Sequence, residues 1–169
     1  MPSSRVPSGR LHSLLAVLAG ALGACADYAI TVNERTVYTP PALFRDFSLA
    51  DGALEACVRQ HILDERITDA GALQTLDCSH AGIADLTGLE LFTGLRRVKL
   101  GGNRIADPAP LAASKGLEVL LLDGNRIVDA SPLWSLDTLE RLDLGGNADL
   151  RCPPQRPPTA ALVLPAHCS

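Results

Sequence analysis

The chain has 169 residues, enough for one domain with a core of its own. Its 15 basic and 19 acidic residues give a formal net charge of −4. No dense basic cluster is present, so nucleic acid is not an expected partner. Aromatic residues make up only 4% of the chain, and the core must therefore be built mainly from aliphatic side chains.

The first residues have the features of a secretory signal. Arg5 and Arg10 precede an apolar run, residues 14–24, that is far shorter than the roughly 20 residues of a membrane-spanning helix. The run ends in Leu-Gly-Ala followed by Cys25, which resembles the lipobox of bacterial lipoproteins. The resemblance implies a signal peptide over residues 1–24 and acyl chains on Cys25 that anchor the protein to a membrane. The alternative is an ordinary signal peptide that happens to contain a cysteine.

The residue after Cys25 indicates in which membrane such a lipoprotein is anchored. Lipoproteins kept at the inner membrane of many Gram-negative bacteria have aspartate there, whereas this chain has Ala26 and then Asp27. The sequence therefore favours the outer membrane, facing the periplasm or the cell surface. Residues 25–46 are assigned as a tether, in which alternating apolar residues between Ile30 and Tyr38 leave a short strand and an extended segment equally open.

A helical cap is predicted over residues 47–72. Between Ser48 and Ile62, with Asp51 as the helix start, apolar residues recur at helical spacing. Such a helix would cover the first coil of a repeat array, which otherwise exposes an apolar cross-section. The inward-facing positions are Leu54, Cys57, Val58, His61 and Ile62.

Residues 73–151 contain a 22-residue repeat. Each unit opens with LxxLxL, and three units continue to an asparagine, a pattern that resembles the leucine-rich repeat. Alternation along a short strand points two residues of each unit inward, and the asparagine amide can satisfy backbone groups at the following turn. The unit starts are Leu73, Leu95, Leu117 and Leu139; the inward pairs are Leu76 and Cys78, Val98 and Leu100, Leu120 and Leu122, and Leu142 and Leu144; the asparagines are Asn103, Asn125 and Asn147.

The second half of each unit predicts tight turns or a short 3₁₀ piece. Isoleucines and leucines align there as a second wall of the core, and prolines exclude a long helix. Ala81 in the asparagine position and Asp149 in an isoleucine position indicate irregular first and last units. The aligned residues are Ile83, Ile105 and Ile127; Leu89, Leu111 and Leu133; and the turn-capping Asp85, Asp107 and Asp129.

Four cysteines remain once Cys25 is assigned to lipid. Cys57 on the inward helix face and Cys78 in an inward strand position predict a bridge between cap and repeats. Cys152 and Cys168 predict a second bridge that closes the tail, residues 152–169, in which ALVLP at 161–165 favours a final strand. Metal binding by Cys78 with His61, His80 or His167 is the disfavoured alternative, because no matched ligand motif is present.

The segment from Phe47 to Ser169 resembles short, internalin-like bacterial leucine-rich repeat lipoproteins. This resemblance rests on the 22-residue units, the cysteine-containing cap, LDCS in the first unit and the late cysteine pair. It implies an α/β fold: a short right-handed leucine-rich repeat solenoid with a curved parallel sheet and an N-terminal helical cap. It also implies a protein-binding role, with no catalytic residues, no cofactor and no small-molecule substrate.

The concave face of that sheet is the predicted site for a protein partner. The apolar pair Val119 and Leu121 lies there among charged residues, a mixture that suits an interface. In the alternative interpretation these residues only pair across strands, as Asp77 and Lys99 would. The predicted partner-binding residues are Arg97, Lys99, Val119, Leu121, Arg141 and Asp143.

The sequence suggests two functions and disfavours a third. The first is a non-enzymatic envelope lipoprotein that binds a protein partner; the second is a structural or surface adhesion lipoprotein without one defined ligand. An enzyme is disfavoured because Asp77, Ser79 and His80 are nearly consecutive on a strand, whose side chains alternate between faces and cannot converge as a catalytic set.

Overall fold

The computed structural model describes residues 30–32, 35–38, 41–153 and 161–168. The chain forms two compact units, Met1–Pro41 and Ala42–Ser169. In the first, strands β1 (Ile30–Val32) and β2 (Arg35–Tyr38) pair antiparallel, which answers the question left open for this segment in favour of strands. Cys25 and the predicted signal peptide lie outside the described residues. None of the described helices is long and apolar enough to cross a membrane.

Helix α1 (Gly52–Glu65) forms the predicted cap helix; it begins after Asp51, as predicted, and continues beyond the predicted end at Ile62. Asp51 is extended and caps the helix, so the helix begins only after it. The helix ends at Arg66, a non-glycine residue in the left-handed conformation, whose N–H bonds to the carbonyl of Ile62. The late end was not predictable because no glycine marks it. The apolar face is as predicted, with Leu54, Val58 and Ile62 buried.

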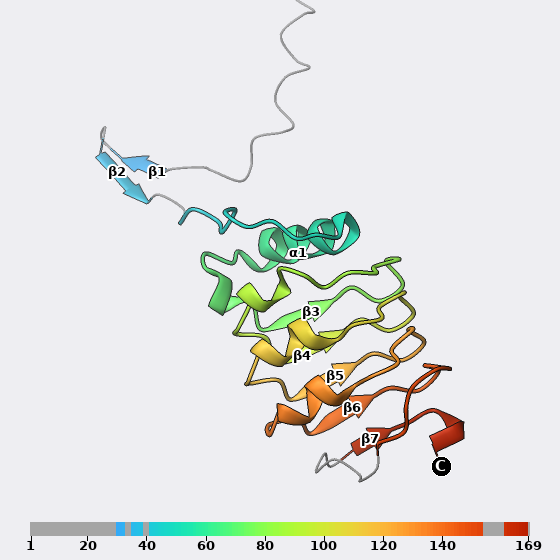
Figure 1. Ribbon diagram of the computed structural model, residues 1–169. Helices are drawn as coiled ribbons and strands as arrows, with labels where there is room; N and C mark the ends of the chain where they lie inside the picture. The colour runs from blue at the N-terminus through green and yellow to red at the C-terminus, as the bar shows by residue number, and fades with distance from the viewer. Residues whose placement is uncertain (1–29, 33–34, 39–40, 154–160, 169) are drawn as a thin grey trace, which may run out of the picture. The chain divides into compact units, whose positions relative to one another are not determined.

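The second unit is built on a five-stranded parallel sheet, stacked in chain order (Figure 1). Each strand carries one central buried or half-buried residue between two residues that face the opposite side. The register is regular: residues 22 apart face each other from the first strand to the fourth, and the fifth continues the rows. The strands are β3 (Thr75–Asp77), β4 (Arg97–Lys99), β5 (Val119–Leu121), β6 (Arg141–Asp143) and β7 (Ala161–Val163).

Short 3₁₀ helices form the return side of the coils, as predicted from the prolines. Asp107 and Asp129 each accept a hydrogen bond from the first N–H of the helix that follows, at 2.9 and 2.8 Å. Asp85 instead bonds to the N–H of Thr87, so it fixes the turn before the helix rather than the helix itself. The helices are η1 (Ala70–Ala72), η2 (Leu89–Leu91), η3 (Ala109–Ala113), η4 (Ser131–Ser135) and η5 (Ala166–Cys168).

The predicted asparagine ladder is present. Asn125 is buried; its Oδ1 accepts from the N–H of Ile105 at 3.0 Å, and its Nδ2 donates to the carbonyls of Leu100 and Leu122 at 2.9 and 3.0 Å. Asn103 and Asn147 make the same three kinds of bond one coil away in each direction. The last unit is therefore more regular than Asp149 suggested. Leu150, one residue later, supplies the buried side chain that an isoleucine supplies in the earlier units.

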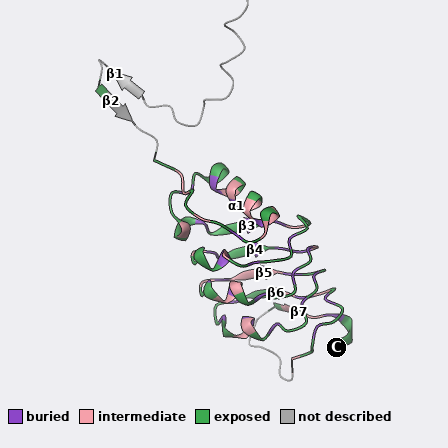
Figure 2. Cartoon of the chain, turned by 45° about the horizontal axis from the view of Figure 1, so that its top comes forward, coloured by how far each residue is buried: buried purple, intermediate pink, exposed green. Residues whose placement is uncertain are grey.

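The core is one continuous column between the sheet and the return side (Figure 2). At its cap end three aromatic rings meet: Phe92 packs edge-to-face against both Phe44 and Phe47, at 6.1 and 5.3 Å between ring centroids. Phe92 is fully buried in the first coil, whereas the other two come from the segment before α1. Phe44, from the predicted tether, and Phe47, from the predicted cap, therefore both pack against the repeats.

Candidate functional site

The exposed side of the five strands is called here the strand face. It consists of two rows: Thr75, Arg97, Val119, Arg141 and Ala161, and then Asp77, Lys99, Leu121, Asp143 and Val163. All six predicted partner-binding residues lie in these rows. Val119 and Leu121 on β5 are half-buried side by side, with the rest of their surface open.

Positive charges on the strand face differ in their partners. Lys99 Nζ lies 3.2 Å from a carboxylate oxygen of Asp77, the cross-strand pair that the alternative interpretation predicted. Arg97 and Arg141, which flank Val119 in the first row, form no ion pair with any described residue and are exposed. Their charges are therefore available to a partner.

The Asp77 carboxylate is hydrogen-bonded to Ser79, just beyond the end of the same strand. The Ser79 hydroxyl, 2.8 Å away, is the main cause of a lowered pKa for Asp77; burial opposes this and Lys99 adds to it. The carboxylate is thus engaged with Ser79 and Lys99.

Two further carboxylates, those of Asp123 and Asp143, lie near glycines at the carboxyl ends of β5 and β6. A side chain at Gly101 would collide with Asp123, whose Oδ1 would lie 2.6 Å from the added Cβ, so glycine leaves room for this carboxylate. Asp143 Oδ1 accepts a hydrogen bond from the N–H of Gly145 at 3.0 Å. Neither carboxylate forms an ion pair with a described residue.

Two strand-face residues are not among the predicted partner-binding residues. Ala161 and Val163 continue the rows on β7. Val163 is 43% exposed and lies next to Asp143, which separates it from Leu121. The segment ALVLP predicted a final strand beside the last coil, and β7 does pair with β6. Its register there does not follow from the 22-residue repeat, because β7 lies outside the repeats.

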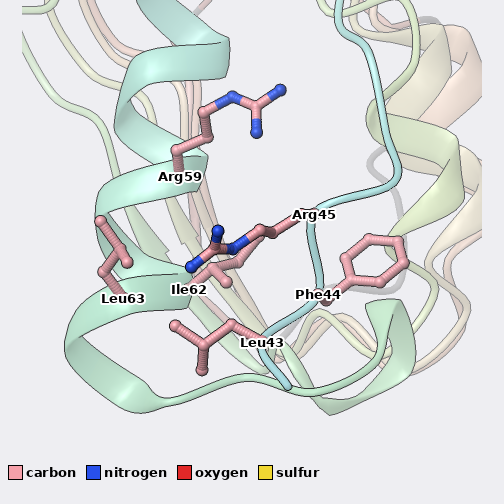
Figure 3. Close-up of a pocket in the computed structure, with 6 residues that line it drawn as sticks. All are labelled: Leu43, Phe44, Arg45, Arg59, Ile62 and Leu63. Carbon is pink, nitrogen blue, oxygen red and sulfur yellow. The ribbon is translucent and has the colours of Figure 1, made fainter. Parts of the chain in front are cut away.

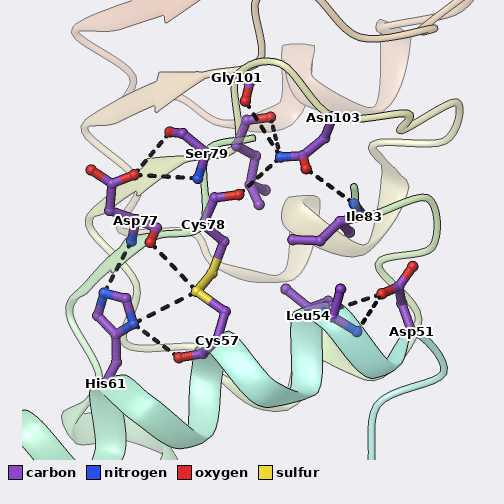
Figure 4. Close-up of a disulfide and its surroundings, with 12 residues drawn as sticks. Asp51, Leu54, Cys57, His61, Asp77, Cys78, Ser79, Ile83, Gly101 and Asn103 are labelled. Atoms are coloured by element: carbon purple, nitrogen blue, oxygen red, sulfur yellow. Dashed lines mark hydrogen bonds between the residues drawn. A yellow bond between two sulfur atoms is a disulfide. The ribbon is translucent and has the colours of Figure 1, made fainter. Parts of the chain in front are cut away.

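The Cys57–Cys78 disulfide joins α1 to the first coil, with 6.0 Å between Cα atoms (Figure 4). His61 lies beside it: its Nδ1 donates to the Cys57 carbonyl at 3.0 Å, and its Nε2 accepts from the N–H of Asp77 at 3.2 Å. These two partners fix the neutral ring with the proton on Nδ1. The ring thereby links the helix to β3 a second time.

The second bridge joins Cys152 and Cys168, with 5.3 Å between Cα atoms, and His167 bonds to the carbonyl of Leu150 at 2.8 Å. In each bridge the two sulfurs and a histidine nitrogen lie within 4.8 Å of one another. The metal-binding alternative needs free thiolates, which a disulfide does not offer. Of the histidines that it named, His80 contacts Gly102 instead.

Asp51 adds an attachment that the sequence analysis missed. Its Oδ1 caps α1 at the N–H groups of Ala53 and Leu54, while its Oδ2 accepts from Ala84 and Asp85 in the first coil at 2.8 and 3.4 Å. Burial acts to raise the pKa of Asp51, but these four N–H groups together lower it below its usual value.

A pocket of about 250 Å³ opens on the cap (Figure 3). Ile62 and Leu63 of α1 and Leu43 and Phe44 of the preceding segment form its apolar walls. The Arg59 guanidinium at its rim is already neutralised by Glu55 at 2.8 Å and stacked on Phe47.

The residues that superficially resemble a hydrolytic set do not converge. Ser79 bonds to Asp77, but His80 lies in a left-handed turn, and no described bond joins it to Ser79. Without a bond between Ser79 and a histidine, the described contacts do not form a serine, histidine and aspartate set.

No protein-family model and no curated protein matches this sequence. Among solved structures, the chain is similar to the internalin inlF from Listeria monocytogenes, with 24% identity and a TM-score of 0.57 over 70% of this chain and 37% of that one. It is also similar to the internalin C2 of the same bacterium, with 20% identity and a TM-score of 0.50 over 61% of this chain and 53% of that one. The chain thus spans about half or less of these proteins. At these identities the likeness establishes the fold: a short α/β leucine-rich repeat solenoid with a helical cap, like that of the internalins.

Proposed function

We propose that this chain is a non-enzymatic, lipid-anchored protein of the cell envelope that binds another protein through the strand face. The observation that carries the proposal is the partly exposed apolar pair, Val119 and Leu121, between the unpaired Arg97 and Arg141. Arginine is enriched at the energetic centres of interfaces, and the buried core of an interface is more apolar than the rest of the surface. The function needs no cofactor, and the solenoid supplies a rigid support.

The test is a double substitution on β5. Val119→Asp with Leu121→Asp should abolish capture of the partner from an envelope extract, as measured by pull-down and mass spectrometry. The matched control is Val128→Asp, because Val128 is an exposed valine outside the strand face. Circular dichroism should show an unchanged fold in both variants, and undiminished capture by the β5 variant would rule out this face.

A further inference from the structure

The unpaired charges of the strand face are segregated along the strand direction. At the strand starts they are positive, from Arg97 and Arg141; at the strand ends they are negative, from Asp123 and Asp143. Lys99 and Asp77 neutralise each other, with 3.2 Å between Nζ and a carboxylate oxygen, and so do not alter this separation of charge. Along β5, Leu121 lies between the row that holds Arg97 and Arg141 and the carboxylate of Asp123, and Asp143 stands beside Leu121 on β6.

We propose that the partner presents an extended protein segment with a matching order of groups. An acidic side chain would lie over Arg97 and Arg141, an aliphatic side chain over Leu121, and a basic side chain over Asp123 and Asp143. This inference rests on the proposed function and names the chemistry of its partner.

The spacing suits such a segment. Side chains on one face of a strand recur every two residues, or about 7 Å, so the positive row and Asp123, four residues beyond Val119, are about 13 Å apart. Arg97 and Arg141 lie two strands apart, about 10 Å, which leaves room for one carboxylate to reach both guanidinium groups. An acid, an aliphatic residue and a base within about five residues of extended chain would therefore span the face.

The two signs of charge decide against other classes of partner. A polyanion such as nucleic acid or an anionic polysaccharide, drawn to the arginines, would meet Asp143 about one side-chain row away and Asp123 about two rows away. An anionic membrane surface would meet the same repulsion. Only a partner that carries both signs around an apolar group satisfies the whole face.

Asp143 is held in place before binding, which supports a role in recognition. The Gly145 N–H donates to its carboxylate, while Gly101 only leaves open the space that Asp123 occupies. Ordering Asp143 costs little further entropy when a cation arrives. Five short strands offer less area than the roughly 800 Å² per partner of a standard interface, so the expected binding is weak and depends on charge.

The experiment is selection of a random 12-residue peptide library, displayed on phage, against the full-length protein in detergent micelles. Wild-type protein should enrich peptides with an acid and a base on opposite sides of an aliphatic residue. Arg97→Glu with Arg141→Glu should weaken these peptides at least tenfold, and new selection on this variant should replace the acid by a base. The matched control is Arg104→Glu with Arg126→Glu, the same charge change on exposed arginines outside the strand face.

The outcomes separate this inference from the proposed function. If Val119→Asp with Leu121→Asp leaves binding of the enriched peptides intact, the strand face is not the site and both fail. If that variant loses binding but the arginine variant does not, the proposed function stands and the charge order is wrong. Enrichment without any acidic preference, or no enrichment at all, also overturns the charge order. Circular dichroism on each variant verifies that the fold persists.

Discussion

At the scale of single residues, Asp51 shows how one carboxylate can join two parts of the molecule. One oxygen caps α1 and the other bonds to the first coil, so the group contributes to the helix and to its docking. The sequence predicted the cap from spacing alone. It could not predict the second contact, because Ala84 and Asp85 bind through backbone N–H groups that carry no sequence signal.

Replacing Asp51 by alanine should lower the free energy of unfolding by about 1–2 kcal/mol. Its pKa is below 3.8 in the folded protein, so its contribution is fully present above that ordinary value and is lost as the pH falls through the folded pKa. The difference between wild type and variant should therefore shrink below about pH 4. Urea unfolding at several pH values measures this. Asp69→Ala, which removes a single cap bond on η1, is the control and should cost less.

Asn125 is the residue whose loss should be most costly in the repeats. Alanine there leaves one carbonyl of its own coil, and one carbonyl and one N–H of the preceding coil, without their buried partner, at an expected cost of about 2–4 kcal/mol. Thermal and urea unfolding would measure the loss. Asp123→Ala, two residues away but exposed, should change stability by less than about 0.5 kcal/mol; equal losses would contradict the ladder's role.

At the scale of elements, the repeats were predictable and the junctions were not. Period 22 fixes which residues face the core, so the strands, the 3₁₀ helices and the rows around Val119 and Leu121 follow from the sequence. No repeat encodes where α1 ends at Arg66, how Phe44 and Phe47 pack on Phe92, or that β7 adds Val163 to the strand face. Those features depend on contacts between segments that occur once in the chain.

The two disulfides should stabilise different elements. The bridges close loops with sequence separations of 21 and 16 residues, which gives about 3 kcal/mol each in the chain-entropy model. Cys57→Ala with Cys78→Ala should also increase hydrogen exchange in α1 while the amides of β5 stay protected. Cys152→Ala with Cys168→Ala is the comparison, and it should instead affect β7. The same exchange pattern in both variants would contradict this assignment.

At the scale of the whole molecule, the proposed anchor decides where the strand face can act. Cys25→Ser should abolish incorporation of labelled palmitate and release the protein from the membrane fraction, because the acyl chains proposed at Cys25 supply the anchoring free energy. Cell fractionation and metabolic labelling measure both effects. Cys152→Ser is the control that removes a different thiol; equal labelling of wild type and Cys25→Ser would rule out the anchor.

The asparagine ladder allows further repeats to be inserted into such a protein. Each asparagine bonds only to its own coil and the one before it, and the first coil, with Ala81 in that position, is attached through Asp51 and the cap disulfide instead. A duplicated block of residues 95–116 would thus find every bond it needs on both sides. The strand face could grow by one strand while the cap and the tail remain unchanged, which makes its size an adjustable property of the chain.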